Sequence, residues 1–274
     1  MENPETLKSR LELCQRFGIR YVSLSGSDEQ KVAGESSDTL SYISSAAETT
    51  SVPIEPVEVP TDPFERRTPD TKPTNPKWLT AFPESVQAME LLAFDRDICE
   101  CQNCPLGKTR QNFVFGSGSP RAEIMFVGEA PGADEDAQGL PFVGKAGQLL
   151  TKIIESTKTW KRSDVFICNV LKCRPPGNRT PQQEEVEQCR PYLEEQIRII
   201  KPKLIMALGA SAAQALLKTK DSVGKMRGKW HDFEGISLRV TYHPAALLRF
   251  EGYKKDVWDD MKELTAKYQE LTGK

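Results

Sequence analysis

The chain has 274 residues, with 39 acidic and 37 basic side chains and a formal net charge of −2. Its longest apolar stretch, residues 204–217, is shorter than the roughly 20 residues that a membrane-spanning helix needs. The first residues have no apolar core behind a basic end, so they match neither a secretory signal nor a transit peptide. We therefore expect a cytoplasmic protein. In that compartment its seven cysteines serve as metal ligands, catalysts or core residues more readily than as disulfides.

The charge divides unevenly along the chain. Residues 1–97 carry 10 basic and 17 acidic side chains, whereas residues 98–274 carry 27 basic and 22 acidic side chains. A basic C-terminal part behind an acidic N-terminal part is typical of a nucleic-acid-binding domain with a tail.

Two segments precede the main domain. Residues 1–22 place apolar side chains at helical spacing between Leu7 and Phe17, which predicts one short amphipathic helix. Such a helix either frays in isolation or docks in the groove of another protein. Residues 23–83 are rich in Ser, Thr, Glu and Pro and have hardly any recurring apolar face, so they predict a disordered linker.

Residues 84–274 alternate short apolar runs with helical patterns. The predicted strands are residues 122–129, 164–172, 203–210 and 237–243. The predicted helices are residues 85–98, 146–157, 181–200, 210–218 and 253–271. This alternation predicts a three-layer α/β/α domain with a mainly parallel central sheet. Sites in such sheets form at the carboxyl ends of the strands.

Four cysteines have the spacing of a metal site. Cys101 and Cys104 form a CxxC pair, while Cys173 and Cys189 lie in two later segments. A CxxC pair can bind one metal centre from a single loop, and two further thiolates complete four ligands. The pattern fits zinc or a four-iron four-sulfur cluster, with ordinary core cysteines as the alternative. The remaining cysteines are not expected to be ligands: Cys14, Cys99 and Cys168.

Three polar side chains lie at predicted strand ends. Glu129 ends the first strand, Asn169 falls late in the second, and His243 ends the fourth. If the strands are adjacent and parallel, these side chains converge on one rim of the sheet. Phe142, in the loop after the first strand, is by itself either a core aromatic residue or a stacking platform. His243 is by itself either a structural histidine or a catalytic one.

Together these motifs resemble a known family. The order and spacing are similar to those of family 4 uracil-DNA glycosylases, the iron–sulfur branch of the uracil-DNA glycosylase superfamily, in the segments CxxCPL, GEAPGxxED, GLPFVGKAGQLL, NVLKCRPPGNR, LGASAA, VGKMRGKW and YHPAALLR. The similarity covers about residues 98–270. It implies a four-stranded parallel α/β/α fold and an enzyme that hydrolyses the N-glycosidic bond of uracil in DNA, the first step of base excision repair.

The resemblance also implies roles for individual residues. One four-iron four-sulfur cluster would be held by Cys101, Cys104, Cys173 and Cys189. Glu129 matches the catalytic carboxylate, and His243 matches a catalytic histidine near uracil O2. Phe142 matches the ring that stacks on uracil, and Asn169 matches the amide that reads it. The substrate-binding set is completed by Gly128, Ala130 and Glu135. Glu135 lies where the family places a residue near uracil C5, which would help to exclude thymine.

One departure concerns relatives that trap their product covalently. Those relatives carry GEQPG and an extra basic, histidine-containing loop, whereas here Ala130 replaces the glutamine and no such insertion follows GKAGQ. The resemblance therefore implies turnover rather than a stable adduct.

We expect a monomer that binds uracil-containing DNA, with a protein partner for the N-terminal helix. The rival hypotheses are a non-catalytic, zinc-stabilised DNA-binding module associated with replication and an iron–sulfur electron carrier.

Overall fold

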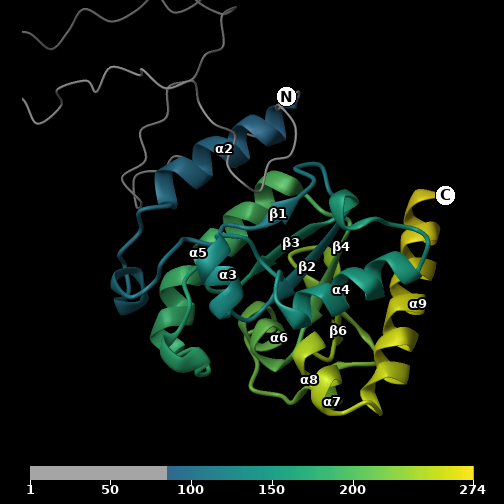
Figure 1. The fold of residues 1–274 in the computed structure, drawn as a ribbon. Helices are drawn as coiled ribbons and strands as arrows, with labels where there is room; N and C mark the ends of the chain where they lie inside the picture. The colour runs from purple at the N-terminus through teal and green to yellow at the C-terminus, as the bar shows by residue number, and fades with distance from the viewer. Residues whose placement is uncertain (1–84, 274) are drawn as a thin grey trace, which may run out of the picture. The chain divides into compact units, whose positions relative to one another are not determined.

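A six-stranded sheet forms the centre of the protein (Figure 1). The structure, a computed structural model, describes residues 85–273, so the predicted N-terminal helix (1–22) and linker (23–83) lie outside the described residues. The sheet has the order β1-β3-β2-β4-β6-β5. The strands are β1 (Ser117–Gly118), β2 (Ile124–Gly128), β3 (Phe166–Asn169), β4 (Leu204–Leu208), β5 (Trp230–Phe233) and β6 (Ile236–Thr241).

The four inner strands, β3, β2, β4 and β6, are parallel to one another, as the sequence predicts. The α/β class and the mainly parallel sheet are confirmed, but the predicted number of four strands was wrong. β1 and β5 add antiparallel edges. β5 joins β6 through Glu234 and Gly235, which both have positive φ, as a two-residue hairpin turn requires. An edge strand is covered less completely, so β5 lacks the continuous apolar run that marks the inner strands.

Helices cover both faces of this sheet. They are α2 (Val86–Ile98), α3 (Ala133–Gln138), α4 (Lys145–Ser156), α5 (Gln183–Ile200), α6 (Ala210–Leu217), α7 (Val223–Met226), α8 (Pro244–Arg249) and α9 (Tyr253–Thr272). α4, α8 and α9 pack against one another, and α9 also packs on β4 and β6. α6 packs on β2 and β4, and α2 packs on α5. Within residues 85–273, no helix is long and apolar enough to cross a membrane.

Alternate residues of the inner strands build the core between the sheet and α4, α8 and α9. Ile124 and Phe126 of β2 and Leu204 and Met206 of β4 are at most 1% exposed and belong to one buried cluster. Since side chains alternate across a strand, the intervening residues face the opposite layer, where they are also buried. The inner strands are therefore fixed on both faces, which leaves their ends free to carry polar groups.

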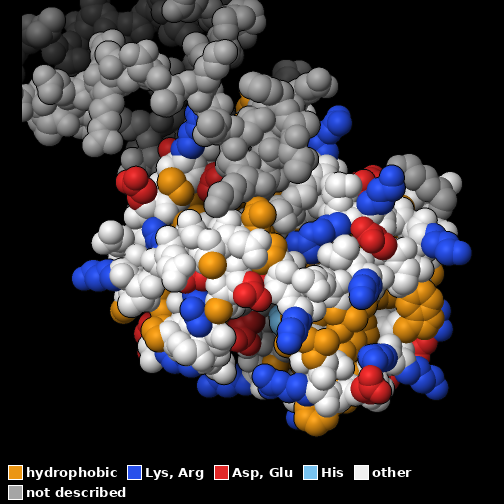
Figure 2. Space-filling model, in the orientation of Figure 1, with side chains coloured by type: hydrophobic (Ala, Val, Ile, Leu, Met, Phe, Trp, Pro, Cys, Tyr) orange, Lys and Arg blue, Asp and Glu red, His pale blue; other side chains and the backbone are white. Residues whose placement is uncertain are grey.

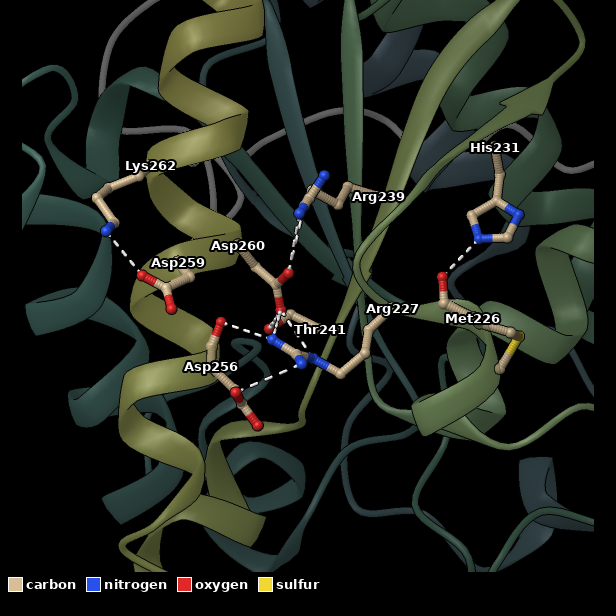
Figure 3. A network of polar contacts seen from close by, with 9 residues as sticks. All are labelled: Met226, Arg227, His231, Arg239, Thr241, Asp256, Asp259, Asp260 and Lys262. Carbon is tan, nitrogen blue, oxygen red and sulfur yellow. Dashed lines mark hydrogen bonds and ion pairs between the residues drawn. The ribbon is translucent and has the colours of Figure 1, made fainter.

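A buried carboxylate on α9 ties this helix to the strand that leads toward His243 (Figure 3). Asp260 is fully buried and accepts from Arg239 at 3.2 Å, from the Thr241 hydroxyl at 2.8 Å, and from Arg227 at 3.1 Å. The contact with Arg227 also holds the segment after α7. Because Thr241 is the last residue of β6, the network fixes the point at which this strand ends.

Asp260→Asn should lower the free energy of unfolding by about 3 kcal/mol, because two guanidinium groups in the interior lose their carboxylate. The matched control is Asp259→Asn on the same helix. Asp259 pairs with Lys262 at 2.7 Å, but both side chains are exposed, so this change should alter stability little. Urea unfolding of both variants measures the difference. Equal stability of the two variants would show that the buried network does not support the fold.

Candidate active site and cysteine site

The ends of β2 and β3 lie side by side. Gly128 and Asn169 are register partners in the parallel pairing of these strands. The pairing continues past the strands, because the Val170 N–H donates to Gly128 O at 2.9 Å and the Leu171 N–H donates to Glu129 O at 3.0 Å. Glu129 and Asn169 are consequently held on the same rim of the sheet.

The ends of β4 and β6 join this rim. Gly209 directly follows β4, and its N–H donates to Thr241 O at 2.8 Å. A Cβ atom on Gly209 would lie 3.0 Å from the Cβ of His243. In the first turn of α6, the Ser211 hydroxyl donates to Oε2 of Glu129. The structure therefore brings together Glu129, Asn169 and His243, as the sequence predicts.

The ring of Phe142 lies against these residues. Its centroid is 5.5 Å from the imidazole centroid of His243. A Cβ on Gly128 would lie 2.5 Å from the ring edge of Phe142 and 2.4 Å from Oδ1 of Asn169. Any larger residue at position 128 would therefore collide with both side chains, which explains why this position is a glycine.

Two charged side chains hold the backbone on either side of Phe142, which has a positive φ of 52°. Glu135 Oε1 accepts from the N–H groups of Val143 and Gly144 at 2.9 and 3.0 Å. Arg162 donates to the carbonyl of Pro141 at 2.7 Å. The other oxygen of Glu135 accepts from the Gly132 N–H at 3.1 Å, so this carboxylate joins both ends of the loop. Ala130 follows Glu129 in the same loop and is partly buried.

His243 is placed as a neutral hydrogen-bond donor. Burial lowers the pKa of its imidazole from 6.5 to about 4, although Glu135 opposes this shift. Its Nδ1 accepts from the Ala245 N–H at 3.2 Å, so the proton of the neutral ring is on Nε2. The other histidine of the chain, His231, instead contacts the carbonyl of Met226 at 2.7 Å (Figure 3).

Asn169 carries an unsatisfied acceptor. The residue is 2% exposed, and its Oδ1 has no hydrogen-bond partner within the described part of the chain. A buried acceptor without a partner costs free energy, so such an atom points to a ligand that donates to it. In Figure 2 a histidine side chain is visible in a hollow of the surface, with charged side chains, several of them Lys or Arg, around it.

The four predicted ligand cysteines line one small cavity, together with Asn103, Gly107, Phe113, Gln188 and Tyr192. Three of their sulfurs accept a hydrogen bond. The Tyr192 hydroxyl donates to Cys101 at 3.1 Å, Arg110 donates to Cys173 at 3.2 Å, and the backbone N–H of Lys172 donates to Cys189 at 3.3 Å. Donors of this kind are usual around metal-bound thiolates, whose basicity and orientation they tune.

The four thiols are not joined in disulfides. Burial raises the pKa of Cys189 to about 12 and also raises the pKa of Cys173, against the effect of Arg110. Among residues 85–273, no group of three or more His, Cys, Asp or Glu side chains is arranged to hold a metal ion. Cys99 does not line the cavity, and Cys168 is fully buried within β3.

Several residues around the two sites were not found by sequence reasoning. Ser211 lies inside the quoted segment LGASAA, but nothing in that segment indicates that its hydroxyl reaches Glu129. Arg162 and Arg110 donate to backbone carbonyls of residues that are not their neighbours in the sequence, so no local sequence pattern indicates these contacts. Tyr192 could have been suspected, because it lies one turn after Cys189 on the same helix.

Comparison with known proteins gives a consistent assignment. Residues 115–262 match the uracil DNA glycosylase superfamily. The chain is 46% identical over 181 residues to a type-4 uracil-DNA glycosylase of Pyrobaculum aerophilum, covering 63% of this chain and 92% of the relative. It is 46% identical over 187 residues to the type-4 enzyme of Archaeoglobus fulgidus, covering 65% and 92%. It is 47% identical over 152 residues to that of Thermotoga maritima, covering 55% and 79%.

The fold and the matched region define a protein of the uracil-DNA glycosylase superfamily. The extent of the identity places it more narrowly: the chain belongs to the type-4 uracil-DNA glycosylases. The resemblance drawn from the sequence motifs is thereby confirmed.

The imidazole of His243 should titrate near pH 4 in the folded protein, because burial disfavours its charged form. The unfolded chain takes up this proton near pH 6.5, so the contribution of His243 to stability should be lost as the pH falls from about 6.5 to 4. Histidine NMR measures the titration directly, since the chain has two histidines and His231→Gln assigns the signals. A His243 pKa at or above 6.5 would contradict the neutral-donor assignment.

Proposed function

We propose that the protein is a DNA repair enzyme that excises uracil from DNA by hydrolysing its N-glycosidic bond. The observation that carries this proposal is the meeting of an aromatic face, an unsatisfied amide oxygen, a carboxylate and a neutral histidine at one rim of the sheet. The type-4 relatives bear the name of this activity.

Recognition requires the base to leave the duplex, because its glycosidic bond is unreachable within the stack. Phe142 offers a ring face on which the flipped base can stack. The unpartnered Oδ1 of Asn169 can accept from uracil N3–H while its amide nitrogen donates to O4. Cytosine presents the opposite donor and acceptor pattern at these positions, so it would leave buried polar groups unpaired.

We assign exclusion of thymine to the loop around Phe142. Thymine differs from uracil by a methyl group at C5, so its exclusion requires a rigid pocket wall that would clash with this methyl group. Glu135 supports that wall through its hydrogen bonds to Gly132, Val143 and Gly144. Its role in the site is thus to hold the loop in place, with the carboxylate occupied by backbone N–H groups.

Bond cleavage produces a cationic sugar and an anionic uracil. Water adds to C1′ of the sugar and loses a proton, while the bonding electrons leave with the base. The Ser211 hydroxyl donates to Oε2 of Glu129, whereas the second carboxylate oxygen has no partner within residues 85–273. This second oxygen can therefore face the sugar cation or the attacking water. The Nε2–H of His243 can donate to uracil O2, where negative charge develops.

Two exposed apolar side chains can support base flipping. Leu248 is 53% exposed and Phe250 is 60% exposed, and both follow His243 within seven residues. An apolar side chain that enters the base stack can fill the gap left by a flipped nucleotide. Their position shortly after His243 in the chain suits this segment to that role.

We also propose that Cys101, Cys104, Cys173 and Cys189 hold one four-iron four-sulfur cluster. When bound, the cluster would cross-link three segments of the chain. We assign it a structural role, because this hydrolysis transfers no electrons. The four thiols share one cavity, yet they do not form a group suited to a single metal ion. Four thiolates are the usual ligands of such a cluster, and the motif resemblance to the iron–sulfur branch favours it over zinc.

The two rival functions leave the strand-end residues without a purpose. A non-catalytic DNA-binding module has no need for a buried, unsatisfied amide beside a carboxylate. An electron carrier needs an exposed cluster, whereas two of the four cysteines, Cys173 and Cys189, are 5% and 7% exposed and the other two are only partly exposed. The observed geometry therefore favours base excision.

The purified protein should release uracil from an oligonucleotide and leave the thymine-containing strand intact, as measured by alkaline cleavage at the abasic site.

Glu129→Gln and His243→Ala should each slow single-turnover cleavage about 100-fold or more, because charge-stabilising groups in shielded sites are worth about 3 to 4 kcal/mol. Phe142→Ala should cost about 1 to 3 kcal/mol and partly weaken binding. Asn169→Asp should weaken uracil recognition, because an acceptor replaces the donor to O4.

His231→Ala is the matched control, because this histidine contacts a backbone carbonyl away from the rim. It should cleave at the wild-type rate. DNA binding without release of uracil would favour the non-catalytic module. Uracil release with unchanged rates in both Glu129→Gln and His243→Ala would show that the strand-end residues are structural.

The purified protein should be brown and contain about four iron atoms per chain. Cys173→Ala and Cys189→Ala should reduce both the iron content and the yield of folded protein, whereas Cys99→Ala should retain the iron. Metal analysis and visible absorption measure these outcomes. A colourless protein with one zinc would contradict the cluster assignment while leaving the glycosylase assay unaffected.

A further inference from the structure

A fully buried lysine lies between the active site and the cysteine cavity. Lys172 is 0% exposed. Its ammonium group donates to the backbone carbonyl of Asn169 at 2.7 Å and to Oε1 of Gln196 at 2.6 Å. Both acceptors are neutral, and no carboxylate in residues 85–273 pairs with it. A buried ammonium ion without an opposite charge is strongly unfavourable, so this site calls for a counter-charge.

The cysteine cavity is a place for that counter-charge, because the positive charge of Lys172 acts on the thiol of Cys189. Lys172 directly precedes Cys173, and its own N–H donates to the sulfur of Cys189. Gln196, the second acceptor, lies two turns after Cys189 on the same face of α5. A four-iron four-sulfur core bound by four thiolates has a net negative charge. The cluster would therefore supply the charge that the described protein groups do not.

The other end of the same side chain reaches the uracil-reading residue. Asn169 presents its unsatisfied Oδ1 at the rim, while its backbone carbonyl is held by the ammonium of Lys172. Gln196 is fixed in turn, because its amide nitrogen donates to the carbonyl of Phe115 at 2.9 Å. The lysine thus has a rigid partner on one side and the end of β3 on the other.

We propose that Lys172 is a positioning residue that couples the charge of the iron–sulfur cluster to the orientation of Asn169. The cluster stabilises the buried ammonium, and the ammonium fixes the strand end that presents the amide to uracil. This inference rests on the proposed function and deepens it, because it gives the cluster an electrostatic role in substrate recognition in addition to cross-linking.

The first test is Lys172→Met, which keeps the length of the side chain and removes the charge. The affinity for a single strand containing uracil should fall about tenfold, whereas the affinity for the matched thymine strand should not change. The cluster should also accept an electron from an added reductant at a more negative potential, because a nearby positive charge favours the reduced form. Lys203→Met, which removes a partly exposed lysine paired with Glu123, should change neither quantity.

The second test keeps the lysine and adds a carboxylate beside it. In Gln196→Glu, the ammonium gains a partner from the protein itself. Removal of iron by a chelator should then lower the thermal unfolding temperature less than it does in the wild-type protein. This comparison remains informative if Lys172→Met fails to fold.

Two results would overturn the proposal. One is a folded Lys172→Met protein with wild-type potential and wild-type uracil affinity. The other is an equal loss of thermal stability on iron removal in the wild type and in Gln196→Glu. Failure of the proposed function is distinct, since it would appear as a wild-type protein that lacks iron or does not release uracil.

Discussion

The parallel register of β2 and β3 is the constraint on which the active site depends. Pairing of Gly128 with Asn169 sets the two polar strand ends side by side, and two further backbone hydrogen bonds extend the pairing into both loops. A slip of one residue would turn the amide of Asn169 to the other face of the sheet, because side chains alternate along a strand. Close packing on both faces of these strands disfavours such a slip, because side chains of different size would then meet each packed surface.

Close packing against glycines fixes the position of Phe142 beside the paired strand ends. Gly128 lets Asn169 and the ring of Phe142 approach the backbone, and a Cβ on Gly147 would lie 1.9 Å from the carbonyl of Phe142. Gly128 therefore leaves room for the edge of the ring, and Gly147 in α4 leaves room for the backbone of Phe142. Its backbone is also held by Glu135 and Arg162. In the proposed role of Phe142 as a stacking platform, a ring held in this way has lost its conformational entropy before the base arrives, which favours binding.

The sequence predicts elements that have a periodic pattern along the chain, and it does not predict contacts between segments that are distant in the sequence. The inner strands and amphipathic helices have clear periodicity, and the residues at strand ends follow from the parallel topology. β5 was missed because an edge strand needs no continuous apolar run. The contact of Ser211 with Glu129 and the burial of Lys172 join segments far apart in sequence. Neither has a local pattern, and a lysine in particular is expected at the surface.

The shortness of one connection joins the two sites into a single unit. Residues 170–172 separate Asn169 from Cys173, and each of these three residues donates its N–H to a fixed acceptor: Gly128 O, Glu129 O and the sulfur of Cys189. No residue of the connection is left to absorb a displacement. Movement of the cysteine loop must therefore be transmitted to the end of β3, where the amide of Asn169 is presented. In the proposed site this amide matches the hydrogen-bonding edge of one base, so under that proposal the rigidity of the cysteine site contributes to specificity.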